Sequence, residues 1–477
     1  MRIYLLLILF TSLFAEGETS KIELKITNHT ITLDKGPISY IAITGKCPIV
    51  DEEYQGDLFF IAYEKQGEEN RPITFFFPGG PGGAGTVEAI LGLGPRRLLT
   101  AEEGRTIFPP YQLIDNPETL LESTDLVFVD PISCGFSKAQ KEADFDRLYS
   151  VEGDILLLAQ WIHTLIDYSG RWNSPIYLAG SSYGTVRCCG LAEHLLSCDI
   201  AVKGIILDGC AIEFSTIHSQ RDKALADVLF IPTCAATAWY HGRLWPEKPL
   251  AEVIECAKHF AYNKYAPFLL QPNRLDPLEK NCFEIELAEL MGLPLNIVRR
   301  YNLRINESIF CSEFFGPERK VLGGLDSRYV GDISTIDPGH SHDPSYLDTF
   351  GVLPAFRHYL KTELETHFPF EAYVLSSPKI LHAWNFATQD SDGLPSFLQR
   401  LRHAMVINPL MNVFIGAGYF DCRTPFAATE YCFDHLDLPI SYRKNIQFAY
   451  YEGGHGFIFD YPLLKKWKTD LSNFYGR

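Results

Sequence analysis

The sequence predicts an α/β protein, in which one sheet of mostly parallel strands is interrupted by a largely helical cap insertion. Short apolar runs that end in Gly, Pro or Asp alternate with segments of helical periodicity, which is typical of strands covered by helices on both faces. Between about residues 214 and 375 helical periodicity continues without a buried strand, which indicates an insertion. A hydrophobic fraction of 46% in 477 residues allows a large core.

The predicted elements follow this order along the chain. Residues 22–63 alternate apolar and polar side chains and are predicted to form antiparallel strands at the edge of the sheet. Buried strands are predicted at Ile73–Phe77, Leu126–Val129, Pro175–Ala179, Gly204–Asp208, Asn412–Gly416 and Gln447–Tyr451. Helices are predicted at Val151–Tyr168, Thr185–Leu196 and Tyr461–Phe474, and in the insertion at Ala251–Tyr262, Phe283–Met291 and Thr349–Glu365. We therefore expect a first core segment at 16–213, a helical cap at 214–375 and a second core segment at 376–477.

The N-terminus has the pattern of a signal peptide. Arg2 supplies a positive charge, Ile3–Phe10 is an apolar run, and Ala15 precedes an abrupt change to polar residues. The run is shorter than the roughly 20 apolar residues that a membrane span needs. We therefore expect residues 1–15 to be removed by cleavage near Ala15 and the mature chain to be exported, to a periplasm or outside the cell, without a membrane span.

Charge and cysteine content exclude several classes of partner. The 42 basic and 59 acidic residues give a net charge of −17, which argues against nucleic acid as a partner. The 12 cysteines include no C-x-x-C pair, so a structural zinc site is not expected, and we predict a few disulfides beside buried free thiols. His340 and His342, with Asp337 and Asp343 nearby, lie in a Pro/Gly-rich segment that is typical of a solvated loop. No metal or other cofactor is expected, and the oligomeric state stays open.

A nucleophile is predicted at Ser182. The segment Gly180–Gly184 fits the pattern G-x-S-x-G, and it lies between a predicted strand and a predicted helix. A serine at such a sharp turn exposes its hydroxyl, provided that the flanking residues are small. The alternative, an ordinary strand–helix turn, is less favoured because the context is the one that the motif requires.

A serine hydroxyl needs a base, and the base needs an orienting acid. His455 follows a predicted strand and has glycines on both sides, so it is the predicted base. Asp421 follows the strand before it and is the predicted acid, in the chain order Ser, Asp, His. Asp434 and Asp437 are rival acids, and Asp421 could instead serve only to cap its own turn.

A glycine-rich segment, residues 78–85, follows the first buried strand. It lacks the patterns of phosphate-binding loops, namely G-x-x-x-x-G-K-[ST] and a G-x-G-x-x-G that opens a helix. In an α/β-hydrolase such a loop gives one amide to the oxyanion hole, and the residue after the nucleophile gives the other. We therefore assign the oxyanion hole to the main-chain amides of Gly80 and Tyr183.

With these residues located, the chain resembles the serine carboxypeptidase family, and in particular its bacterial branch. The resemblance runs from about Ile73 to Asp460. The resemblance includes the nucleophile turn with Tyr183 and Gly184 and the segments around Asp421 and His455. It also includes four further segments: Asp125–Ser137, Arg171–Pro175, Ala235–Gly242 and Leu325–Arg328. The resemblance implies an α/β-hydrolase fold with a cap and the release of C-terminal residues from peptides.

Two positions depart from that family. It usually has Asn where Pro78 stands and Glu where Ser181 stands, and in the family these two side chains hold the C-terminal carboxylate of the substrate. Arg187, about one turn into the following helix, is a candidate substitute charge, although a role in fold electrostatics is equally compatible with its position. The sequence thus predicts a serine-type carboxypeptidase that acts on peptide substrates. A serine esterase or acyltransferase, and a binding module without turnover, are the alternatives.

Overall fold

The fold is described from a computed structural model. It covers residues 22–476, except for 34, 51–54, 102–107, 140–144, 221, 273, 275, 334–342, 346–350, 367, 370–372 and 388–394. The expected signal peptide at 1–15 and the residues Asp337, His340 and His342 lie outside the described residues.

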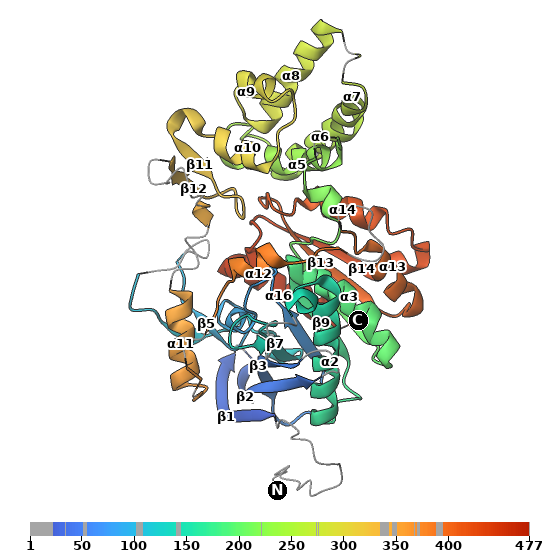
Figure 1. The fold of residues 1–477 in the computed structure, drawn as a ribbon. Helices are drawn as coiled ribbons and strands as arrows, with labels where there is room; N and C mark the ends of the chain where they lie inside the picture. The colour runs from blue at the N-terminus through green and yellow to red at the C-terminus, as the bar shows by residue number, and fades with distance from the viewer. Residues whose placement is uncertain are drawn as a thin grey trace, which may run out of the picture.

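One mixed sheet forms the centre of the molecule (Figure 1). Its strand order is β1-β2-β3-β7-β4-β9-β10-β13-β14, with β8 paired to β3, and the strands from β7 to β14 along this order run parallel. Their bounds are β1 Glu23–Leu33, β2 Gly36–Val50, β3 Gln55–Lys65, β4 Ile73–Phe77, β7 Asp125–Val129, β8 Lys138–Ala139, β9 Ile176–Ser181, β10 Val202–Asp208, β13 Asn412–Gly418 and β14 Ile446–Tyr451. The predicted α/β fold, with antiparallel strands at one edge, is confirmed.

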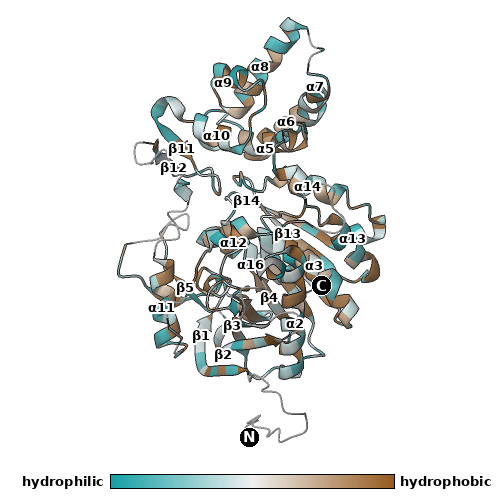
Figure 2. Cartoon of the chain, in the orientation of Figure 1, coloured by the Kyte–Doolittle hydropathy of each residue, from teal (hydrophilic) through white to brown (hydrophobic). Residues whose placement is uncertain are grey.

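Helices before β10 and after residue 397 include several that pack on this sheet. Their bounds are α1 Phe145–Leu148, α2 Val151–Ser169, α3 Tyr183–His194, α13 Leu398–Ile407, α14 Phe426–Asp434, α15 Ile440–Arg443 and α16 Tyr461–Tyr475. Helix α3 contacts β9 and β10 and packs beside α2 and α13, whereas α16 contacts β13 and β14. Figure 2 shows hydrophobic ribbon along α2 and α3, while β2 alternates between hydrophilic and hydrophobic residues. This alternation is typical of a strand that is buried on one face only.

The segment between β10 and α13 is mainly helical. Its elements are α4 Phe214–Ile217, α5 Leu225–Tyr240, α6 Leu250–Phe260, α7 Ala266–Leu270, α8 Pro277–Met291, α9 Leu295–Arg300, α10 Glu307–Glu313, β11 Lys320–Leu322, β12 Val330–Asp332, α11 Val352–Thr362 and α12 Pro378–Ala383. Helices α5 to α10, the cap cluster, enclose a hydrophobic core of their own. The side chains of α11 and α12 instead join the core around the sheet. A small hairpin pairs β5 Arg96–Leu98 with β6 Leu113–Asp115.

Two further expectations can be compared with the structure. All 12 cysteines are free thiols and most are buried, so the expected disulfides are absent from the described residues. That prediction was wrong because an even cysteine count says nothing about which sulfurs lie within bonding distance. A search of the described residues finds no helix long and apolar enough to cross a membrane.

Candidate active site

Ser182 stands at the turn between β9 and α3. Its backbone has φ 55° and ψ −123°, a conformation that L-residues rarely adopt and that marks a strained functional turn. The turn is possible only between glycines. A Cβ on Gly180 would lie 2.2 Å from the carbonyl oxygen of Gly184, and a Cβ on Gly184 would lie 2.2 Å from that of Phe77. The amide of Ser182 donates to the carbonyl oxygen of Asp208 at 2.9 Å, which fixes the turn against β10.

His455 lies on the loop after β14 and is oriented by Asp421. The distance from His455 Nδ1 to Asp421 Oδ2 is 2.7 Å. Burial lowers the pKa of His455, but the charge of Asp421 and its hydrogen bond outweigh burial, so the net pKa lies above the ordinary value. Because Nδ1 is held by the carboxylate, Nε2 is the nitrogen left to exchange a proton with a hydroxyl.

The carboxylate of Asp421 is fully buried and accepts several hydrogen bonds. Oδ1 accepts from the amides of Arg423 and Thr424 at 2.8 and 2.9 Å, and Oδ2 accepts from the Thr424 hydroxyl at 2.5 Å as well as from His455. Asp421 therefore caps its own turn and also contacts the imidazole. The rival Asp437 has a side chain that is 94% exposed, and Asp434 is the last residue of α14.

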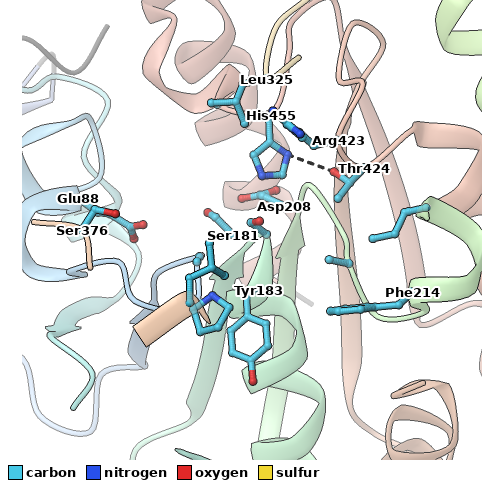
Figure 3. Close-up of a pocket in the computed structure, with 18 of the residues that line it drawn as sticks. Glu88, Ser181, Tyr183, Asp208, Phe214, Leu325, Ser376, Arg423, Thr424 and His455 are labelled. Atoms are coloured by element: carbon cyan, nitrogen blue, oxygen red, sulfur yellow. Dashed lines mark hydrogen bonds between the residues drawn. The ribbon is translucent and has the colours of Figure 1, made fainter. Parts of the chain in front are cut away.

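A cavity of about 980 Å³ brings these elements together (Figure 3). Ser182 and His455 both line it, although no hydrogen bond joins their side chains in the described part of the chain. Such bonds are often long in unliganded enzymes and shorten when substrate binds. The hydroxyl of Thr424 lies 3.2 Å from His455 Nδ1, so it braces the same nitrogen that Asp421 holds.

The predicted oxyanion donors also line the cavity. A Cβ on Gly79 would lie 2.8 Å from the Cβ of Ser182, so the glycine-rich loop packs directly on the nucleophile turn. Gly80 has φ 116°, and its amide donates to no backbone acceptor among the described residues. The amide of Tyr183 is the first of α3 and has no acceptor within the helix.

The three candidate substrate-binding residues are placed differently from one another. Ser181 lines the cavity, whereas Pro78 and Arg187 do not. Arg187 is 1% exposed; its Nε lies 2.6 Å from Asp154 Oδ2, and its Nη1 donates to the carbonyl oxygen of Pro78 at 2.6 Å. These contacts favour a structural role for Arg187, because its guanidinium is paired with Asp154 and with the backbone of Pro78 and does not face the cavity.

Several residues at the site were not predicted from the sequence. Gly209, with φ 59°, leaves room for the imidazole, because a Cβ there would lie 2.9 Å from His455 Cε1 and Nδ1. The loop beyond the cap cluster holds the histidine: the carbonyl oxygen of Leu325 accepts the amide of His455 at 2.6 Å, and Asp326 Oδ2 accepts that of Gly454 at 3.1 Å. Leu325 and Asp326 lie in a segment that carried the family resemblance, which was their only signal.

Two acidic side chains line the cavity as well. Burial raises the pKa of Glu88 to about 8 and that of Asp208 to about 8. Asp208 accepts hydrogen bonds from Trp467 Nε1 at 3.2 and 3.1 Å. Within the described residues no group of His, Cys, Asp and Glu side chains is arranged to hold a metal ion.

The parallel sheet, with a strained serine after β9 and a paired histidine and aspartate after β14 and β13, is an α/β-hydrolase fold. The crystal structure of KEX1Δp, a prohormone-processing carboxypeptidase from Saccharomyces cerevisiae, shares this fold, with a TM-score of 0.57, 13% identity and 94% of each chain covered. The family model described as serine carboxypeptidase matches residues 44–266. Over these residues the chain is therefore similar to serine carboxypeptidases.

Curated relatives carry the same family name. Serine carboxypeptidase-like 37 from Arabidopsis thaliana is 25% identical over 267 residues, which are 51% of this chain and 52% of the relative. The pheromone-processing carboxypeptidase KEX1 from Arthroderma otae is 31% identical over 137 residues, which are 28% of this chain and 20% of the relative. The chain therefore spans about half of the first relative and a fifth of the second.

Proposed function

We propose that this chain is an exported serine carboxypeptidase that hydrolyses peptide bonds near the C-terminus of its substrate through an acyl-enzyme on Ser182. One observation carries the proposal. A histidine paired at 2.7 Å with a buried carboxylate lines the same cavity as a serine on a strained strand–helix turn. This combination of nucleophile, base and orienting acid is the one that acyl transfer requires.

In the proposed mechanism His455 Nε2 removes the proton from the Ser182 hydroxyl as the oxygen attacks the scissile carbonyl. The amides of Gly80 and Tyr183 stabilise the oxyanion of the tetrahedral intermediate. The imidazolium, stabilised by Asp421, then gives its proton to the leaving amine, and the peptide bond breaks. Water then attacks the acyl-enzyme while His455 again acts as the base. This step releases the shortened peptide with a free carboxyl group and restores the Ser182 hydroxyl.

The assignments of residue roles and segments belong to the same proposal. We propose a signal peptide at 1–15, core segments at 16–213 and 376–477, and a cap at 214–375 that covers the site. Export to a periplasm or outside the cell is proposed from the signal-peptide pattern that ends near Ala15. A resemblance to the bacterial branch is also proposed, and the motif segments Arg171–Pro175 and Leu325–Arg328 support it.

A covalent probe tests the proposal. The full chain is treated with a fluorophosphonate, and we expect one labelled serine that disappears in Ser182→Ala. The matched control is Ser181→Ala, which removes the neighbouring hydroxyl and should leave labelling in place. Absence of labelling in the wild-type protein would favour a binding module.

The same protein is then given paired peptides that end in a free carboxylate or in an amide. Faster release of the last residue from the free peptide is expected of a carboxypeptidase. Equal rates on both peptides would remove the exopeptidase claim and favour the esterase or acyltransferase alternative, which the loss of Asn and Glu at positions 78 and 181 motivates.

A further inference from the structure

Glu88 is a buried carboxyl that the proposed mechanism does not use. It lies in the short 3-10 helix Thr86–Ile90, directly after the glycine-rich loop, and is 9% exposed. It lines the cavity that contains Ser182, and Figure 3 shows it beside Ser376, across the cavity from His455 and Arg423. Among the described residues its carboxyl makes no hydrogen bond or ion pair.

The charged groups around Glu88 are all committed to other partners. Arg187 is paired with Asp154, and Asp130 accepts hydrogen bonds from Thr86 and from the amide of Phe136. Asp208 is held by Trp467. No neighbour therefore offers a direct charge-assisted bond to the carboxyl of Glu88.

Burial decides the protonation state of Glu88. It raises the pKa of Glu88 to about 8; Arg187 lowers this pKa, and Asp130 and Asp208 raise it. At neutral pH the side chain is thus a neutral carboxyl with one proton to donate. Because no acceptor among the described residues takes that proton, the natural acceptor is a ligand in the cavity.

The best acceptor for a buried neutral carboxyl is a carboxylate, because an O–H···O⁻ bond is short and charge-assisted. A carboxylate beside an ionised glutamate would be repelled, whereas beside the neutral form it is bound. The substrate of the proposed function ends in such a group. Neither Pro78 nor Arg187 reaches the cavity to bind it.

We propose that Glu88 is a substrate-binding residue that donates a hydrogen bond to the C-terminal carboxylate of the peptide and so selects exopeptidase cleavage. This inference rests on the proposed function, and it assigns selectivity to the helix after the glycine-rich loop. It also sets a limit on pH. As the pH rises through about 8, Glu88 ionises and the binding of a free carboxylate is lost.

The test compares Glu88→Ala and Glu88→Gln with wild type on the paired free and amidated peptides. Glu88→Ala should lower kcat/KM for the free peptide by about ten- to a hundredfold, the range expected for a hydrogen bond to a charged group. Its effect on the amidated peptide should be small. Glu88→Gln keeps an N–H donor, so it should retain activity on the free peptide and lose the decline that wild type shows above pH 8.

Glu64→Gln is the matched control. Burial also raises the pKa of Glu64, but this residue lies on β3 and does not line the cavity, so its pH profile should equal that of wild type. Fluorophosphonate labelling of Ser182 checks that each variant is folded. Two results would overturn the inference: a free-to-amide preference that is unchanged in Glu88→Ala, or an alkaline decline that persists in Glu88→Gln. A wild-type protein without any preference would instead remove the proposed function itself.

Discussion

The sheet domain and the cap cluster differ in how they are built and in what they give to the site. The residues of the proposed triad come from turns after the parallel strands β9, β13 and β14, so the sheet fixes their spacing. The cap cluster has its own hydrophobic core, and among the buried residues of that core only Cys422 comes from outside the segment between β10 and β13. The sheet therefore places the reactive groups, whereas helices α5 to α10 pack around an interior of their own.

The two regions meet at the histidine. The loop with Leu325 and Asp326 follows the cap cluster and holds the amides of His455 and Gly454. We therefore expect substitutions at the strand ends to affect kcat strongly, and substitutions in the loop to affect it weakly. The three predictions below test this order.

The largest effect is expected for Asp421→Asn. Loss of the carboxylate removes the charge that orients His455 and stabilises the imidazolium, and kcat should fall by roughly 10⁴-fold. The wild-type base must be neutral to work, and Asp421 raises its pKa, so the acid limb of activity should lie above the ordinary pKa of histidine. Without Asp421, burial and Arg423 lower the pKa of His455, and the acid limb of kcat/KM should move to lower pH.

Asp437→Asn is the control for that prediction, because its side chain is 94% exposed. It should change neither kcat nor the position of the acid limb. A wild-type optimum of kcat/KM near pH 4–5, where carboxyl groups ordinarily titrate, would contradict the role of His455 as the group that limits activity at low pH.

An intermediate effect is expected for Gly209→Ala. The new methyl group would lie 2.9 Å from the imidazole, so His455 must move, and kcat should fall on the order of 10²-fold. Gly170→Ala is a matched control: Gly170 has a similar φ of 66°, but a Cβ there meets nothing within 4 Å. Both variants carry backbone strain of about 1–2 kcal/mol in the free energy of unfolding. Equal kcat values for the two would show that Gly209 does not set the position of the ring.

The smallest effect is expected for Asp326→Ala. The substitution removes the acceptor of the Gly454 amide and the ion-pair partner of Arg328. Because neither contact is made by the imidazole itself, kcat should fall by about tenfold or less. Asp276→Ala, which removes the N-cap of α8, is the control in the cap cluster. It should lower the free energy of unfolding by about 1 kcal/mol and leave kcat unchanged. A loss in Asp326→Ala as large as that in Asp421→Asn would mean that the two regions do not act separately.

The fold could be predicted from the sequence because its signals are local. The runs Ile73–Phe77 and Asn412–Gly416 are largely apolar; the first coincides with β4 and the second lies within β13. The positions of Ser182, Asp421 and His455 at strand ends follow from chain order and from the way parallel strands meet at one edge. Their catalytic roles stay predictions until the substitutions above are measured.

What could not be predicted depends on contacts between distant segments. Nothing local distinguishes Glu88 from any other helical glutamate, and its burial arises only when the loop folds onto the sheet. Gly209 resembles any glycine after a strand until the ring of His455 is placed against it. Arg187 was a candidate for the cavity because helical spacing does not say which buried carboxylate an arginine will meet.

The separate apolar interior of helices α5 to α10 also bears on how such a protein can change. Because that interior includes a single buried residue from outside the segment, Cys422, substitutions inside it can accumulate without moving the reactive groups. Where α5 and α6 approach the turn of Asp421, in contrast, Ala236 and Ile254 pack with Phe420 and Phe426, so sequence change there is coupled to the site.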